Sequence, residues 1–164
     1  MFAKTKAEKQ TEIERLGLSP FTGQIVAIGL MDYDTGQGGV YFQTPKAKQL
    51  VERIEEGVKY VPGSEQQILE RFWDVVKNYQ QVITFNGRSF DAPYIYIRSL
   101  ALGVAATKDL MPNRYSTVAH VDLKDQLQFY GAMNARFSFH TVCRTFGIGS
   151  PKDNGVTGLD VPIL

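Results

Sequence analysis

The stretch from Gln81 to Asp91 constrains the fold of this chain most, because it has the pattern of a strand, a tight turn and the start of a helix. Residues 81–85 form a short β-branched and aromatic run, which Asn86-Gly87 ends with typical turn residues. Asp91 then falls at the carboxyl end of a strand, where ligands gather in open α/β sheets and where a carboxylate on a rigid turn is well placed to bind a divalent cation. An acidic residue in a first helical turn also complements the helix macrodipole, and this second interpretation stays open.

Hydrophobic patterns predict further elements on both sides of this stretch. Residues 24–31 are expected to form a strand whose antiparallel partner is 39–43, with a hairpin turn over 32–38. Residues 45–56 are polar and charged, and we expect an exposed segment with helical character. Ser64 and Gln67 form a capping-box pattern, and apolar residues then recur at helical spacing and predict a core face: Ile68, Leu69, Phe72, Trp73, Val76 and Tyr79.

The second half of the chain continues the alternation of strands and helices. A helix is predicted from Ser89 to Leu102, a strand over 118–123, and a short helix that begins at Ser138 and ends at Gly147. The apolar stripe of the first of these helices is expected to comprise Phe90, Tyr94, Ile97, and Leu100 or Ala101. A hairpin followed by alternating helices and strands predicts an α/β fold with a mixed sheet flanked by helices.

Composition sets broad limits on domain number and location. At 164 residues with 43% hydrophobic content, residues 1–164 are expected to form one domain. The net charge of +1 gives no global signature of a nucleic-acid binder, so phosphate contacts must be local. The single cysteine, Cys143, excludes an internal disulfide and is expected to be a buried, inert thiol. No run of eighteen apolar residues and no secretion signal occurs, so we expect a cytoplasmic protein without a membrane partner.

Residues 83–94, Ile-Thr-Phe-Asn-Gly-Arg-Ser-Phe-Asp-Ala-Pro-Tyr, resemble the second exonuclease motif of ribonuclease H-like 3'-5' exonucleases. The resemblance is to prokaryotic proteins related to the proofreading domain of family B DNA polymerases. Other segments are similar to earlier and later blocks of that family, namely 16–20, 24–29, 120–123 and 146–149. The resemblance implies a ribonuclease H-like fold, a divalent metal cofactor (Mg²⁺ or Mn²⁺), and a single-stranded 3' end of nucleic acid as partner. It favours DNA over RNA, but no residue in the sequence decides between the two. Asp91 is the implied catalytic residue and metal ligand.

Two-metal hydrolysis of a phosphodiester requires more than one carboxylate. The family carries an Asp-x-Glu pair on its first strand, and Glu12-Ile13-Glu14 occupies the corresponding place before residues 16–20. On a strand, Glu12 and Glu14 would share a face and reach one cation. The preceding residues 4–11 are charged, unlike a central strand, so residues 1–17 form either a degenerate first strand or a solvated arm that separates the two carboxylates.

The family's last helix, with its final aspartate, has no counterpart before Leu164, so an incomplete domain is expected. An incomplete domain leaves a second hypothesis open besides the exonuclease. The chain would then be a catalytically inactive nucleic-acid-binding module, or a structural fragment, of the same fold.

Other acidic and histidine residues have simpler interpretations. Asp32 and Asp34 have the spacing of a metal pair but lie in a Gly-rich turn, where aspartates commonly bind their own backbone. Asp122, followed by Asp125, is a further candidate for a metal ligand, and the resemblance places this block near the site without making it a principal ligand. The alternative is a structural use of these residues as a cap or as ion-pair partners. The spacing of the two histidines, His120 and His140, matches no compact metal motif.

The predicted nucleic-acid contacts are Asn86, Phe90, Arg88 and Lys152. Asn86 tolerates a left-handed turn conformation and, by resemblance, also lies where a strand would pass the metal ions. Phe90 is expected to pack in the core or beneath the terminal base. Arg88 and Lys152, like Arg98 and Lys108, are candidates for phosphate contacts, with ordinary solvated surface as the alternative.

Overall fold

The computed structural model describes residues 16–44 and 51–154. The predictions for Glu12 and Glu14, for the first strand or arm and for the missing last helix therefore lie outside the described residues, as do residues 45–50. None of the helices in the described ranges is both long enough and apolar enough to cross a membrane.

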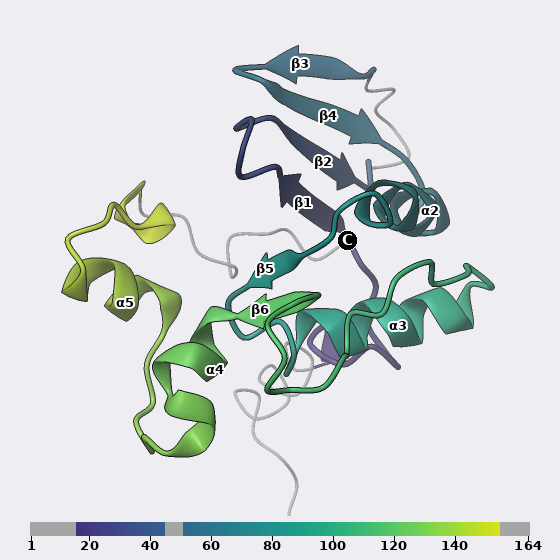
Figure 1. Cartoon of the computed structure of the whole chain (residues 1–164). Helices are drawn as coiled ribbons and strands as arrows, with labels where there is room; N and C mark the ends of the chain where they lie inside the picture. The colour runs from purple at the N-terminus through teal and green to yellow at the C-terminus, as the bar shows by residue number, and fades with distance from the viewer. Residues whose placement is uncertain (1–15, 45–50, 155–164) are drawn as a thin grey trace, which may run out of the picture.

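Four strands form a mixed sheet in the order β1-β2-β4-β3 (Figure 1). The strands β1 (Ala27–Met31) and β2 (Gly38–Phe42) form the predicted antiparallel hairpin. The turn between them is closed by Asp32, whose Oδ1 accepts hydrogen bonds from the N–H groups of Asp34 and Thr35, as expected for a turn aspartate. Next to β2 lies the parallel strand β4 (Val58–Pro62).

The prediction of helical character over residues 45–56 is wrong for its described end. Residues Arg53–Glu55 form the edge strand β3, which pairs antiparallel with β4. The guanidinium of Arg53 lies 4.8 Å from the centre of the Tyr60 ring across this pair. Such a cross-strand contact stabilises a strand in a charged segment that has little strand propensity of its own.

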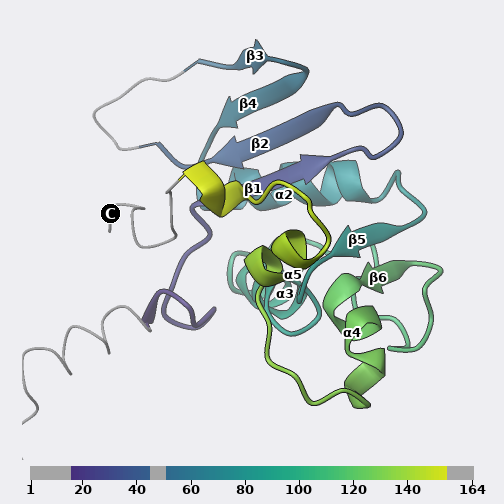
Figure 2. The ribbon, with the colours of Figure 1, turned by 90° about the vertical axis from the view of Figure 1, so that its left-hand side faces the viewer.

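A separate pair of parallel strands consists of β5 (Val82–Thr84) and β6 (His120–Asp122), both predicted. Within residues 16–44 and 51–154, β1 pairs only with β2 and β5 pairs only with β6. Each of these strands thus has one unpaired edge, and Figure 2 shows β5 and β6 beside the β1 end of the larger sheet.

Helix α2 (Glu65–Val76) begins at Ser64, where the predicted capping box is formed in full. Its apolar face is buried against β1, β5 and α3, as the hydrophobic spacing indicated. Tyr79, which was expected on this face, lies beyond the end of the helix and is 41% exposed.

Helix α3 (Asp91–Ala101) is present as predicted. In the predicted apolar stripe Tyr94 is buried and Ile97 is partly buried, but Phe90 and Leu100 are exposed, so the stripe is wrong at those two positions. Its buried residues are Ala92, Tyr94 and Ser99, whereas Leu100 is 83% exposed. The buried indole N–H of Trp73 in α2 donates a 2.8 Å hydrogen bond to Ser99 Oγ. This polar requirement of α2 sets the rotation of α3 about its axis.

A buried ion pair fixes the segment that leads into β1 against both helices. Glu65 Oε1 accepts hydrogen bonds from Ile25 N–H at 2.9 Å and from Arg98 Nε at 2.7 Å, and Glu65 Oε2 accepts another from Arg98 Nη2 at 2.8 Å. Arg98 is therefore committed to the fold rather than available to a phosphate.

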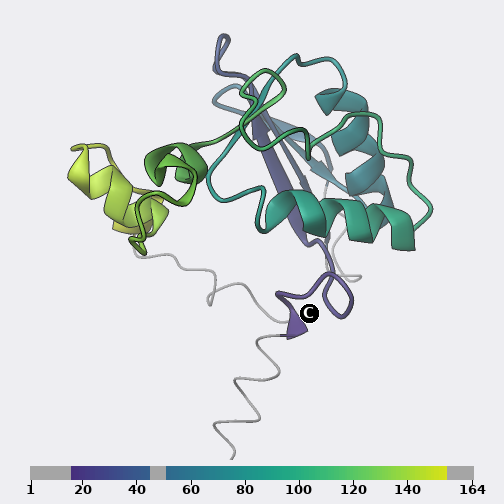
Figure 3. The same cartoon turned by 60° about the horizontal axis from the view of Figure 1, so that its bottom comes forward.

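The C-terminal part contains α4 (Leu123–Leu127), η1 (Phe129–Gly131), α5 (Phe139–Thr145) and η2 (Pro151–Asn154). Figure 3 shows α4 and α5 on the side of β6 away from α2 and α3. Helix α5 begins at Ser138 and is followed by Gly147 with φ +68°, as predicted, and Cys143 is buried. The predicted α/β class with a mixed sheet and flanking helices is confirmed.

Candidate active site

The turn between β5 and α3 carries the residues that the sequence singled out. Asn86 has φ +66°, the left-handed conformation predicted for it. Gly87 is required because a Cβ at this position would lie 2.5 Å from Thr84 Oγ1. Hydrogen bonds from Ser89 N–H to Asn86 O (3.1 Å) and from Ala92 N–H to Gly87 O (2.8 Å) close the turn. Asp91 is thereby held as the first residue of α3.

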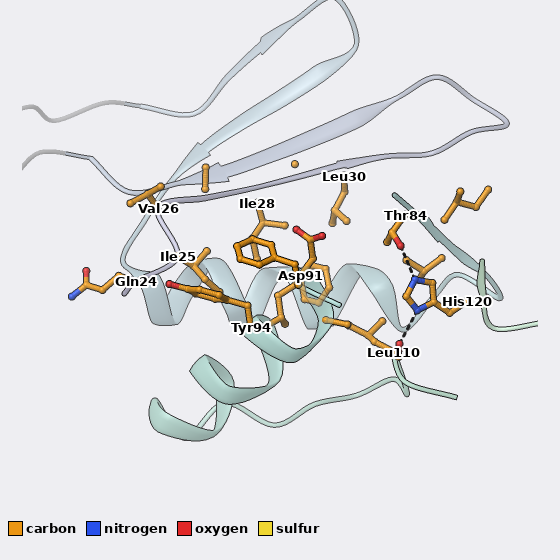
Figure 4. Close-up of a pocket in the computed structure, with 18 of the residues that line it drawn as sticks. Gln24, Ile25, Val26, Ile28, Leu30, Thr84, Asp91, Tyr94, Leu110 and His120 are labelled. Carbon is orange, nitrogen blue, oxygen red and sulfur yellow. Dashed lines mark hydrogen bonds between the residues drawn. The ribbon is translucent and has the colours of Figure 1, made fainter. Parts of the chain in front are cut away.

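A cavity of about 430 Å³ lies between β1, β5 and the first turn of α3 (Figure 4). Its walls are largely apolar and include Ile25, Ile28, Leu30, Val82, Phe90 and Tyr94. The Asp91 carboxylate points into this cavity toward β1. Both β1 and β5 line this cavity, and Asp91 is the one acidic residue that the described part of the chain contributes to it.

The environment of Asp91 disfavours its charged form. Burial among the cavity walls raises the pKa of its carboxyl above the ordinary aspartate value, and the negative charge of Asp122 acts in the same direction. Its own backbone N–H opposes this shift. The side chain still reaches solvent, and no cation contributes to its pKa. A carboxylate in this state would gain from a bound positive ion.

His120 forms part of the cavity wall, a position that was not predicted from the sequence. Its Nδ1 lies 2.7 Å from the carbonyl oxygen of Leu110, so Nδ1 carries the proton. Its Nε2 lies 2.8 Å from Thr84 Oγ1, and the two atoms share a hydrogen bond. Both ring nitrogens are therefore used within the fold. Over the described residues no group of three or more His, Cys, Asp or Glu side chains is arranged to hold a metal ion.

The acidic residues of the β6–α4 segment have the structural uses that were expected. Asp122 is the N-cap of α4 and accepts a 3.0 Å hydrogen bond from Lys124 N–H. Asp125 forms an ion pair with the guanidinium of Arg114. The histidine near the C-terminus, His140, lies 2.8 Å from Ser150 Oγ and does not line the cavity.

The structure separates the predicted nucleic-acid contacts. Phe90 lines the cavity, is 41% exposed and stacks near Tyr94, so its placement in the core was wrong. Arg88 is turned inward: its side chain is 10% exposed and Nη2 donates to Pro112 O at 2.5 Å. In this position Arg88 contacts groups within the fold, and its phosphate contact stays a prediction. Lys152 is exposed in η2 but does not line the cavity.

Lys124 is the basic residue that the sequence interpretation overlooked. Its Nζ donates a 3.0 Å hydrogen bond to Asn86 Oδ1, which brings a positive charge to the turn that carries Asp91. The available signal was its position just after the predicted strand over 118–123, whose carboxyl end lies beside that of residues 81–85. The other basic candidate, Lys108, donates to the carbonyl oxygens of Tyr79 and Gln80.

Comparison with known proteins gives consistent matches. Residues 23–164 match the family described as predicted 3'-5' exonucleases related to the exonuclease domain of PolB. DNA polymerase 1 of Sulfurisphaera ohwakuensis is 37% identical over 65 residues, and DNA polymerase 1 of Saccharolobus solfataricus is 41% identical over 69 residues. Each match covers 37% of this chain and 8% of the polymerase. A third, DNA polymerase 1 of Sulfolobus acidocaldarius, is 46% identical over 39 residues, which are 24% of this chain and 4% of the polymerase.

Proposed function

Because the chain belongs to the family of 3'-5' exonucleases related to the exonuclease domain of PolB, we propose that it acts on the single-stranded 3' end of DNA with the help of a divalent metal ion, and that Asp91 is its catalytic metal ligand. The family acts on nucleic acid, and the choice of DNA follows the polymerases that the chain resembles. The observation that carries the proposal is the Asp91 carboxylate, which points into the cavity at the carboxyl end of β5.

The chemistry of the site suits a hard cation such as Mg²⁺ or Mn²⁺, which prefers oxygen ligands. A bound ion would supply positive charge to the scissile phosphate. The residues described around the cavity offer one carboxylate, Asp91, and a second metal ligand must come from elsewhere. We assign that role to Glu12 and Glu14.

Among the described residues, β1 and β5 each have an edge without a strand partner, and both strands line the cavity, which supports this assignment. Gly17 lines the cavity, and the Tyr94 hydroxyl donates a 3.0 Å hydrogen bond to its carbonyl oxygen. Gly17 therefore lies beside the site, three residues after Glu14 in the sequence. In this proposal residues 1–164 act as one domain, and residues 1–17 contribute the strand that carries Glu12 and Glu14 between the two edges.

The nucleic-acid strand would pass the turn that holds Asp91. The exposed ring of Phe90 offers a stacking surface for a terminal base, and the Asn86 side chain offers a hydrogen bond to a sugar or phosphate. Lys124 adds a positive charge beside Asn86. Lys152 would meet a phosphate farther along the strand.

A second candidate function is nucleic-acid binding without catalysis. It is favoured by the single carboxylate that the described residues bring to the cavity, because one aspartate alone cannot hold two metal ions. Hydrolysis of single-stranded DNA separates the two functions, since both predict binding and only the first predicts product.

The test uses the full chain with a single-stranded oligonucleotide labelled at its 5' end, in Mg²⁺ and separately in Mn²⁺. An exonuclease that acts from the 3' end gives a ladder of shortened labelled products, which chelation of the metal abolishes. Asp91→Ala is expected to remove this activity while binding of the strand persists. If Asp91→Ala produced the ladder of shortened products at the rate of the wild type, Asp91 would not be the catalytic metal ligand.

A further inference from the structure

Asp122 does more in this structure than cap a helix. Its carboxylate is buried, with the residue 4% exposed, and its two oxygens accept three backbone hydrogen bonds. Oδ1 accepts from Asn86 N–H at 2.8 Å and from Lys124 N–H at 3.0 Å, and Oδ2 accepts from Arg88 N–H at 2.9 Å. Only the bond to Lys124 belongs to the cap of α4, so two of the three bonds hold the turn after β5.

The turn that Asp122 holds is the one that ends in Asp91. Thr84, the last residue of β5, pairs in register with Asp122, which puts the carboxylate directly beside the turn. Asn86 is in a left-handed conformation, which is costly for a residue with a side chain and persists only when neighbouring groups fix it. The hydrogen bonds at Asn86 and Arg88 fix both ends of that conformation. From Gly87 the backbone bond to Ala92 carries the constraint across Asp91.

A second contact from the same segment points to the same use. Lys124, two residues after Asp122, donates its Nζ to the Asn86 side chain at 3.0 Å. The start of α4 therefore binds both the backbone and the side chain of Asn86. By contrast, the helix that Asp91 begins has no side-chain cap of its own, because Phe90 occupies the N-cap position.

We propose that Asp122 is a positioning residue that holds the Asn86–Arg88 turn and thereby orients the Asp91 carboxylate toward its metal ion. This role rests on the proposed function, since it matters for the reaction only if Asp91 binds the ion. Groups that hold a metal ligand in place commonly change metal affinity by about 10- to 100-fold when they are removed.

Asp122→Asn is the appropriate variant because it preserves the shape of the side chain. The amide keeps one oxygen and replaces the other with an NH₂ group, which cannot accept a hydrogen bond. At least one of the two bonds to the turn is therefore lost. Asp125→Asn is the matched control. Asp125 is a buried carboxylate in α4, the helix that Asp122 caps, and it binds the Arg114 side chain and lies 4.0 Å from Arg88 Nε without contacting the backbone of the turn.

The first measurement is the Mn²⁺ concentration that gives half-maximal hydrolysis of the labelled strand, at a temperature at which each variant is folded. We expect about a tenfold or greater increase for Asp122→Asn, with kcat recovering at saturating Mn²⁺, and a wild-type Mn²⁺ dependence for Asp125→Asn. A wild-type dependence in folded Asp122→Asn, or an equal increase in both variants, overturns the proposal. If Asp122→Asn does not fold, Asp122→Glu is measured in its place under the same criteria, because it keeps both oxygens and displaces them by one methylene group.

The second measurement is amide hydrogen exchange without metal or substrate. Asn86 and Arg88 are expected to be protected in the wild-type chain and in Asp125→Asn, and to lose protection in Asp122→Asn while α3 amides such as Ser99 keep theirs. Unchanged protection of Asn86 and Arg88 in Asp122→Asn overturns the positioning role. This result is independent of activity: a wild-type chain that hydrolyses no strand refutes the proposed function, whereas the exchange result still decides the role of Asp122.

Discussion

The backbone N–H of Asn86 donates a 2.8 Å hydrogen bond to the carboxylate of Asp122, which lies 36 residues later in the chain. This bond joins the carboxyl ends of the parallel strands β5 and β6. It connects a turn recognisable in the sequence to a distant aspartate that holds the turn in place. The position of Asp91 is therefore a property of two chain segments rather than of its own motif.

Asp91 is expected to lower stability while it serves the reaction. Burial raises the pKa of the Asp91 carboxyl in the folded chain. The contribution of Asp91 to the free energy of unfolding is therefore fully present below the pKa that the group has in the unfolded chain, and it is lost as the pH rises through the pKa of the folded chain. Asp91→Asn should therefore unfold at a higher temperature than the wild type at neutral pH, and the difference should disappear well below pH 3.8, the ordinary value for aspartate. Thermal unfolding followed by circular dichroism measures both. A lower midpoint at neutral pH contradicts the cause given for the pKa.

Gly87 is predicted to be essential to the turn. A methyl group at this position meets Thr84 side-chain atoms at 2.5–2.8 Å, so Gly87→Ala must displace Thr84 or the turn. We expect a loss of about 1–3 kcal/mol in unfolding free energy, measured in urea, and impaired hydrolysis of the labelled strand. Gly149→Ala is the control, since its added Cβ meets nothing within 4 Å. Equal stability of the two variants would argue against this turn geometry.

The hydrogen bond between Trp73 and Ser99 is predicted to hold α2 against α3. Ser99→Ala leaves the buried indole N–H without a partner, which should cost about 1–3 kcal/mol in unfolding free energy. Ser89→Ala, at an exposed position before α3, should change it by less than about 0.5 kcal/mol. Urea denaturation of both variants is the check, and the prediction fails if their midpoints coincide.

Glu12 and Glu14 are tested together because one glutamate is expected to compensate in part for the other. If both are metal ligands, the double variant Glu12→Gln/Glu14→Gln needs about tenfold or more Mn²⁺ for half-maximal hydrolysis. Glu8→Gln, in the same charged run, serves as the control. A double variant with the metal dependence of the wild type would instead favour a solvated arm.

The elements that were predictable from the sequence have local signals. The capping box at Ser64, the cap at Ser138 and the Asn86-Gly87 turn each depend on contacts within a few residues, and each is formed. Strand β3 was missed because its charged residues gain strand stability only through β4 and the ring of Tyr60. The buried face of α3 was predicted wrongly because Ser99 is buried where it accepts a hydrogen bond from the Trp73 indole N–H of α2, which the pattern of α3 alone does not show.

The candidate site also contains features that have a local signal in the sequence and features that depend on residues far along the chain. The place of Asp91 at the carboxyl end of a strand followed from the strand-turn-helix pattern. The inward direction of Arg88 did not, because it depends on the carbonyl oxygen of Pro112 and on Asp125. The contact of Lys124 with Asn86 was overlooked because it depends on the parallel pairing of β5 with β6, and the place of Lys124 just after the predicted strand over 118–123 was the one signal for it.

The central claim is that Asp91 binds the divalent metal ion, and paramagnetic broadening by Mn²⁺ tests it directly. Amide resonances of the isotopically labelled chain are recorded during titration with Mn²⁺, for the wild type and for Asp91→Asn. We predict selective broadening of Phe90, Asp91 and Ala92 in the wild type, little effect on Cys143 in α5, and loss of the selective broadening in Asp91→Asn. Selective broadening of the same three amides in Asp91→Asn, or broadening centred elsewhere in the wild type, would contradict the assignment.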